Sequence, residues 1–218
     1  GGHIALDEMG LIQHSGGTLV DDCWSPYWCF TNVKHQLCCA HLIRELKGVE
    51  ENHPNQTWAA KFKSMLLNLK HAKEKAIAKG KAALHRNTLK RYSDLYDEIM
   101  RLAYEENPIP ERKPGKRGKT KFGKVLCLIN RLFSHKGEVC RFAYDFDVPF
   151  DNNQAERDIR NIKVKIKVSG CFRSIEGAQE YLKIMSFVST AIKHGFSGFE
   201  AIRLAVLGNP LSIFNQGF

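Results

Sequence analysis

Apolar positions in the first half of the chain recur at the three- and four-residue spacing of an amphipathic helix. Between Trp58 and about Lys79, for example, Phe62, Leu66 and Leu69 fall on one stripe. The same spacing predicts helices over residues 4–12, 38–51 and 84–105. The two long segments within 57–105 predict an antiparallel helical hairpin.

Strands are predicted only as short pieces. Thr18–Val20, which runs into Asp21 and Asp22, and Val33–Leu37 have the composition of short buried strands. The alternation of Lys163, Lys165 and Lys167 with apolar residues predicts another strand. Pro149 predicts an extended segment at 148–150, and residues 169–173 predict a turn or a strand. Further helices are predicted over residues 122–134, 137–144, 155–162, 178–194 and 199–207. The expected fold class is therefore mostly α with a few strands, of α/β origin.

Composition narrows the class of protein. A hydrophobic content of 43% is too high for a disordered chain. The sequence contains no run of about 18 apolar residues, so no membrane span is predicted. The net charge of +10 lies within residues 112–173, which hold 16 basic and 6 acidic side chains, while the remainder balances at 17 and 17. This concentration of positive charge favours binding to a polyanion, with nucleic acid the leading candidate. The alternative is an ordinary solvated surface.

The seven cysteines are odd in number and irregularly spaced, and no signal peptide is recognisable. This pattern predicts reduced thiols and a cytoplasmic location. Cys38 and His41 form a Cys-x-x-His unit that supplies two candidate zinc ligands. The alternative is that both side chains pack and hydrogen-bond at the start of a helix.

Two groups of carboxylates are candidate metal ligands. Asp21 and Asp22 end a predicted strand, where a carboxylate is well placed to bind Mg²⁺ through oxygen. Glu156 lies in an acidic patch within the basic region. The alternatives are a solvated turn for the first group and, for Glu156, a capping box with Asn153 and an ion pair with Arg160.

Basic residues surround the second group and are candidate phosphate ligands. On and after the predicted helix they are Arg157, Arg160, Lys163, Lys165, Lys167 and Arg173. Segment 107–121 is a predicted flexible loop with three Pro, two Gly and six Lys or Arg, among them Lys116, Arg117 and Lys119. Contacts between basic side chains and phosphates contribute salt-sensitive affinity for nucleic acid but no sequence specificity. The alternative for the three alternating lysines is an edge strand protected by charge.

Several of these motifs together resemble the transposases of the bacterial insertion-sequence 66 family. The similarity rests on residues 19–27 (LVDDCWSPY), 37–46 (LCCAHLIREL) and 148–160 (VPFDNNQAERDIR). It continues through Lys163-Val164-Lys165 and residues 169–174 (SGCFRS), and the basic Pro/Gly loop also has a counterpart.

The resemblance implies a ribonuclease-H-like core with an Asp-Asp-Glu triad and a helical insertion. It assigns Asp22, rather than Asp21, as the second Asp and Glu156 as the Glu, and it implies two Mg²⁺ ions between such carboxylates. Cys38 and His41 would mark the start of the insertion. The implied partners are DNA, a second copy of the chain on DNA, and accessory proteins of the same element, with no membrane.

No residue of this sequence corresponds to the first Asp of the triad. We therefore expect the C-terminal part of a catalytic domain that is inactive in strand cleavage by itself. The expected parts are 1–37, a partial core; 38–106, the helical insertion; 107–121, the flexible basic loop; 122–208, the rest of the core and the C-terminal helices; and 209–218, a tail. The alternative function is a non-catalytic DNA-binding module from a truncated or decayed element.

Overall fold

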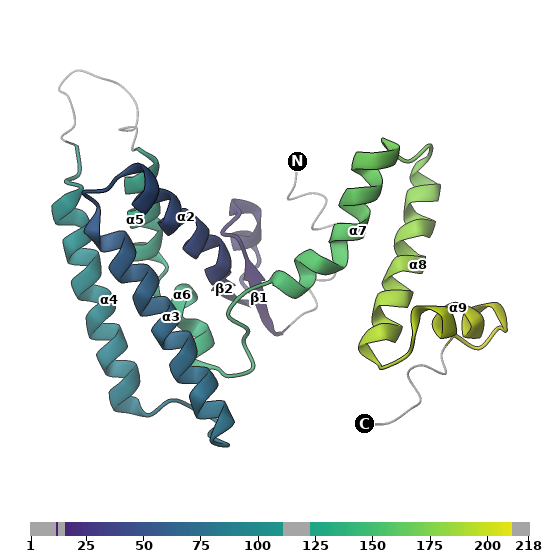
Figure 1. The fold of residues 1–218 in the computed structure, drawn as a ribbon, viewed down its shortest axis with the longest axis horizontal. Coiled ribbons are helices and arrows are strands. Elements are labelled where there is room, and N and C mark those ends of the chain that lie inside the picture. Colours follow the sequence, from purple (N-terminus) through teal and green to yellow (C-terminus); the bar gives the residue numbers. More distant parts are fainter. Residues whose placement is uncertain (1–11, 13–15, 111–122, 211–218) are drawn as a thin grey trace. The chain divides into compact units, whose positions relative to one another are not determined.

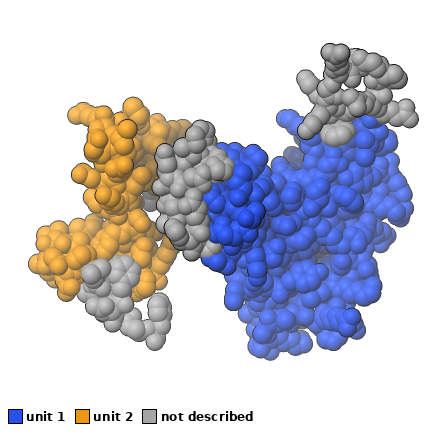
Figure 2. Space-filling model, turned by 180° about the vertical axis from the view of Figure 1, so that it is seen from behind, with its two compact units in different colours: residues 1–152 blue, residues 153–218 orange. Residues whose placement is uncertain are grey.

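The computed structural model describes residue 12 and residues 16–110 and 123–210, and it divides into two compact units (Figure 2). Unit 1 ends at Asn152, and unit 2 begins at Asn153. Each unit is described by itself below. The division into five parts expected from the resemblance stays a prediction.

Unit 1 combines a small parallel sheet with five helices among its described residues (Figure 1). The strands are β1 (Thr18–Asp21) and β2 (Lys34–Leu37), joined by a connection that contains the 3₁₀ helix η1 (Ser25–Cys29). The helices are α2 (Cys39–Asn52), α3 (Thr57–Ala78), α4 (Arg86–Glu106), α5 (Lys124–Ser134) and α6 (Lys136–Tyr144). The predicted helical hairpin is confirmed, since α3 and α4 pack side by side.

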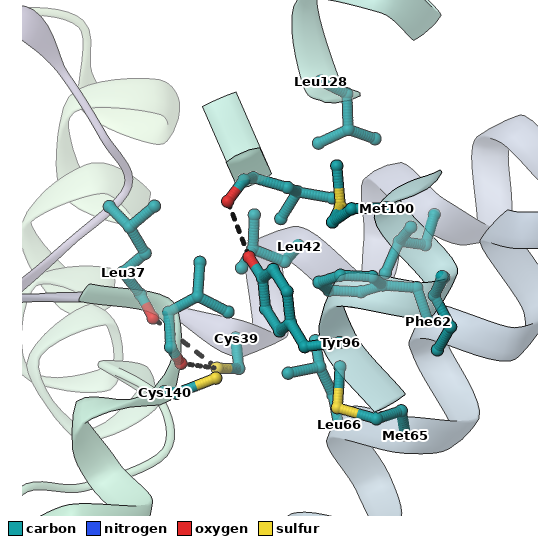
Figure 3. Packing of buried hydrophobic residues seen from close by; sticks show 14 of the residues in the cluster. Leu37, Cys39, Leu42, Phe62, Met65, Leu66, Tyr96, Met100, Leu128 and Cys140 are labelled. Carbon is teal, nitrogen blue, oxygen red and sulfur yellow. Dashed lines mark hydrogen bonds between the residues drawn. The ribbon is translucent and has the colours of Figure 1, made fainter. Parts of the chain in front are cut away.

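The core of unit 1 lies among its helices. Phe62 of α3 and Tyr96 of α4 meet edge to face, with ring centroids 4.9 Å apart. The Tyr96 hydroxyl donates a hydrogen bond of 2.6 Å to the backbone oxygen of Leu132 (Figure 3). This bond satisfies the polar end of a side chain that is otherwise fully buried. The helices therefore pack around large apolar side chains with their polar atoms paired.

Gln36 joins the sheet to α6. Its amide nitrogen donates to the backbone oxygen of Val139 at 3.2 Å, and its amide oxygen accepts from the backbone nitrogen of Phe142 at 2.8 Å. Gln36 is completely buried, where an unpaired amide would cost about 1–3 kcal/mol. These bonds fix β2 against α6 in one register.

Unit 2 consists of α7 (Asn153–Ser169), α8 (Ile175–Lys193) and α9 (Gly198–Val206). Serine side chains cap two of these helices: Ser174 accepts from the nitrogen of Gly177 at 3.0 Å, and Ser197 accepts from the nitrogen of Glu200 at 3.1 Å. Gly170 follows α7 with φ of +74°, the left-handed conformation that commonly ends a helix. The predicted turn after residue 169 therefore begins at this glycine.

The mostly helical fold class is confirmed, but the strand predicted at Lys163, Lys165 and Lys167 is wrong. These residues belong to α7, which continues to Ser169 instead of ending near residue 162. Alternation of lysine with β-branched residues favours a strand only weakly, whereas a helix that has already begun gains one bond per added residue. The predicted helix at 4–12 lies outside the described residues, except for its last residue.

Candidate active site

The parallel sheet brings two sequence motifs to one edge. In the register of β1 and β2, Asp21 is opposite Leu37. The next residues, Asp22 and Cys38, leave the carboxyl ends of neighbouring strands. In open α/β sheets this edge is where ligands bind.

Asp21 and Asp22 have different surroundings. Asp21 is buried, and its Oδ2 lies 3.1 Å from Nδ1 of His35. Burial raises the pKa of Asp21, and the bond with His35 opposes that rise. Asp22 is exposed and accepts only from the backbone nitrogen of Trp24, at 3.2 Å, among the described residues. Asp21 thus has a structural partner, while Asp22 presents a carboxylate to solvent.

The backbone after these aspartates is held in an unusual conformation. Cys23 has φ of +67°, which a non-glycine residue rarely adopts. Its nitrogen donates to Oδ1 of Asp21 at 2.7 Å, and the nitrogen of Trp24 donates to Asp22. Two successive Asx turns of this kind explain the conformation. They also fix the direction of the Asp22 side chain.

A pocket of about 220 Å³ lies at this edge of the sheet, and we call it the Asp22 pocket. Strand residues meet residues of α2 and α5 in its lining, which includes three carboxylates and two guanidinium groups: Asp21, Asp22, Glu45, Arg44 and Arg131. Acidic and basic groups side by side suit a substrate that carries negative charge together with a cation. Glu45 belongs to the motif at residues 37–46, but no local sequence signal placed it beside Asp22 or indicated Arg131, because these residues lie far apart along the chain.

Cys38 binds a residue that directly precedes unit 2. Its Sγ donates to Oδ1 of Asn152 at 3.0 Å, and the backbone nitrogen of Asn152 donates back to Sγ at 3.4 Å. The nitrogen of Cys39 also donates to the backbone oxygen of Phe150, at 3.0 Å. Cys38 therefore has a structural role in fastening segment 150–152 to the start of α2.

The zinc alternative requires two ligands in addition to Cys38 and His41. Within residues 16–110 and 123–210, no group of three His, Cys, Asp or Glu side chains is arranged to hold a metal ion. Both residues line the Asp22 pocket. The bonds of Cys38 with Asn152 fit the structural alternative.

Because α7 is a helix throughout, its charged residues are arranged by helical faces rather than by the two faces of the predicted strand. At about 100° per residue, positions 156, 160, 163 and 167 share one face. Glu156, Arg160, Lys163 and Lys167 therefore form a stripe, which we call the α7 stripe. Its three cationic side chains are exposed, and Glu156 is half-buried. Three of the predicted phosphate ligands thus follow the candidate catalytic glutamate along the helix.

Lys165 lies on the opposite face of α7 from this stripe. Its Nζ is 6.0 Å from the ring centre of Phe172 and 5.6 Å from that of Tyr181. Cation–π contacts of this kind stabilise an ammonium group by about 0.5–1 kcal/mol at exposed sites. Among the described residues, Lys165 therefore has a cation–π contact that Lys163 and Lys167 do not have.

The remaining basic candidates are dispersed. Arg157 is exposed on α7, where it donates to Gln154 at 3.3 Å, and Arg173 is exposed between α7 and α8. Lys116, Arg117 and Lys119 lie outside the described residues. No described helix is both long enough and apolar enough to cross a lipid bilayer.

These features describe a mostly helical protein with carboxylates at a small parallel sheet and cations along one helix. Residues 5–180 match the family described as "Transposase IS66 family". The match covers most of the chain, and the chain belongs to this family of transposases, as its motifs predicted. Searches among curated proteins and among solved structures gave no match.

Proposed function

We propose that the chain belongs to the catalytic machinery that cuts and joins DNA at the ends of an insertion sequence. Asp22 and Glu156 are the proposed Mg²⁺ ligands, in a core of ribonuclease-H-like origin. The exposed carboxylate of Asp22 at the carboxyl ends of two parallel strands carries this proposal. The family match supports DNA as the substrate.

The donor atoms fit the proposed metal. Mg²⁺ prefers oxygen ligands and binds through one or two carboxylates together with water and phosphate. Asp22 retains one carboxylate oxygen, Oδ2, that accepts no hydrogen bond from the described residues. When bound, Mg²⁺ ions would activate the attacking oxygen and stabilise the leaving oxygen of a phosphodiester.

The chain itself supplies position and charge. The Asx turns at Asp21 and Asp22 orient the Asp22 carboxylate, and the α7 stripe offers cations for the DNA backbone. Cys38, which lines the Asp22 pocket, binds Asn152, and Glu156 follows Asn152 by one helical turn in the sequence. The resemblance in sequence is what assigns Glu156 to the same reaction as Asp22.

The Asp-Asp-Glu triad implied by the resemblance needs a third carboxylate. Since the resemblance assigns no residue of this sequence to that position, we expect the 218-residue chain to bind DNA without cutting it. Mg²⁺-dependent nicking of element-end DNA by the purified chain would contradict that expectation. A non-catalytic DNA-binding role is the second candidate function, because α7 presents exposed cations and contacts of lysine and arginine with phosphate need no metal.

Transposition of a marked element, in cells that express the natural gene encoding this chain, separates the two functions. Asp22→Asn and Glu156→Gln should each lower the transposition frequency more than about 100-fold, since even second-shell changes at metal sites cost 10–100-fold. Glu51→Gln, an exposed carboxylate on α2, is the matched control and should have no effect. Unchanged transposition in Asp22→Asn would refute the metal assignment.

A further inference from the structure

An ion pair between two helices forms part of the lining of the Asp22 pocket. Arg131 of α5 pairs through Nη2 with Oε2 of Glu45 of α2, and both residues line the pocket together with Asp22. The Arg131 side chain is 24% exposed and that of Glu45 is 46% exposed. The pair is therefore reachable by a ligand that enters the pocket.

Arg131 lies beside the segment that carries Asp22, because Arg131, Asp22 and Cys23 all line the Asp22 pocket.

Arg131 also has unused capacity for hydrogen bonding. Its Nε is buried and has no hydrogen-bond partner among the described residues. A guanidinium has five N–H donors in a planar fork, which matches the oxygens of a phosphate. Glu45 uses only part of that fork. The neighbouring Arg44 differs, because its Nε donates to the backbone oxygen of Ala40 at 3.3 Å within its own helix.

We propose that Arg131 binds a phosphate of the DNA strand in the Asp22 pocket, and that Glu45 occupies its guanidinium when DNA is absent. This inference rests on the proposed function, since it takes DNA as the ligand of this pocket. Entry of DNA exchanges one anionic partner of Arg131, the Glu45 carboxylate, for another, a phosphate. Glu45 therefore competes with DNA, and its removal strengthens binding.

The test measures binding of the full chain to a short fluorescein-labelled DNA duplex by anisotropy over a series of salt concentrations. Arg131→Gln should weaken binding about fivefold at ~0.1 M salt and reduce the slope of log K against log salt by about 0.9, the value for one phosphate contact. Glu45→Gln should tighten binding. In the Arg131→Gln background, Glu45→Gln should have no effect.

The double variant separates this inference from a general effect of charge. If Glu45→Gln tightens binding equally in both backgrounds, Glu45 acts only through its charge and the proposal is wrong. An unchanged salt slope in Arg131→Gln also overturns it. The matched controls are Arg101→Gln and Glu105→Gln, an exposed ion pair on α4 that should show no such non-additivity.

Folding is checked by circular dichroism. If Arg131→Gln loses the native spectrum, Arg131→Lys replaces it, because lysine keeps the charge and loses the planar fork. Arg131→Lys should weaken binding with the salt slope unchanged, and binding equal to the wild type would overturn the proposal. The result is distinguishable from failure of the proposed function, since Asp22→Asn tests the metal ligand in transposition independently of DNA affinity.

Discussion

Units 1 and 2 bury their apolar residues to different extents. Unit 1 encloses side chains as large as Trp58, Phe62 and Phe142, all completely buried. Among the described residues of unit 2, only Ala191 and Ala201 are buried, and larger apolar side chains such as Phe199 are exposed. Unit 1 therefore has a core of its own, whereas unit 2 is held by helix caps and partly exposed contacts.

The two candidate catalytic residues lie in units that differ in the extent of their buried core. Asp22 follows a strand that is hydrogen-bonded within a packed unit, and its backbone is fixed by two turns. Glu156 lies on a helix of the unit with little core. Regions with few buried apolar contacts open at lower free energy than packed ones. We therefore expect the Asp22 pocket to be preformed and the position of Glu156 to depend on what α7 binds.

The largest effect expected is the loss of core packing in unit 1. Phe62→Ala should lower the free energy of unfolding by about 3–5 kcal/mol, through lost burial and the cavity left behind. Urea unfolding followed by tryptophan fluorescence measures this, because Trp24, Trp28 and Trp58 all lie in unit 1. The matched variant Phe199→Ala in unit 2, followed by circular dichroism, should change stability by no more than about 0.5 kcal/mol. Equal losses of unfolding free energy in both variants would contradict the conclusion that only unit 1 has a buried core.

A second effect concerns the faces of α7. The double variant Lys163→Gln/Lys167→Gln should reduce the slope of log K for DNA against log salt by about 1.8, or about 0.9 per phosphate contact. Lys165→Gln, on the opposite face, should leave the slope unchanged. Filter binding over a salt series measures all three proteins. A strand-like arrangement would make Lys165 equivalent to the other two, so equal effects would contradict the helical stripe.

The smallest effect expected is electrostatic. Nζ of Lys193 lies 2.5 Å from Oδ2 of Asp158 and links α8 to α7. The bond with Lys193 lowers the pKa of Asp158 below its ordinary value of 3.8. The link therefore contributes fully above pH 3.8 and is lost as pH falls through the lowered pKa. For a partly exposed pair this contribution is a few tenths of a kcal/mol.

Thermal unfolding of the wild type and Asp158→Asn between about pH 5 and about pH 2.5 tests this sign. The difference in midpoint between the two proteins should shrink toward the acidic end. Glu180→Gln, an exposed carboxylate on α8, provides the comparison and should show no such trend. A wild-type midpoint that rises relative to that of Asp158→Asn on acidification would show that the Asp158 pKa is raised rather than lowered.

Much of unit 1 was predictable because its helices have regular apolar stripes. The stripe of Phe62, Leu66 and Leu69 correctly predicted α3, and Leu19 and Val20 correctly predicted β1. The second half of α7 was mispredicted because Val164 and Ile166 are β-branched and alternate with lysine. Local pattern cannot separate a short strand from a continuing helix in such a segment.

The candidate site was predictable only where its residues are close in sequence. Asp22 and Cys38 were identified from their motifs. The motifs gave no indication that Cys38 binds Asn152 or that Arg131 pairs with Glu45, because these contacts join distant segments. Such contacts follow from the packing of α2 against other parts of unit 1, which no local pattern encodes.

The proposed function requires that Asp22 and Glu156 bind the same metal ion. Iron(II) substituted for Mg²⁺ reduces added hydrogen peroxide to hydroxide and a hydroxyl radical, which cuts the backbone next to the iron ligands, and mass spectrometry locates the cuts. With DNA bound, we expect cuts beside residues 22 and 156 that excess Mg²⁺ suppresses, and the loss of both in Asp22→Asn. Cuts beside residue 156 that persist in Asp22→Asn would contradict a shared site.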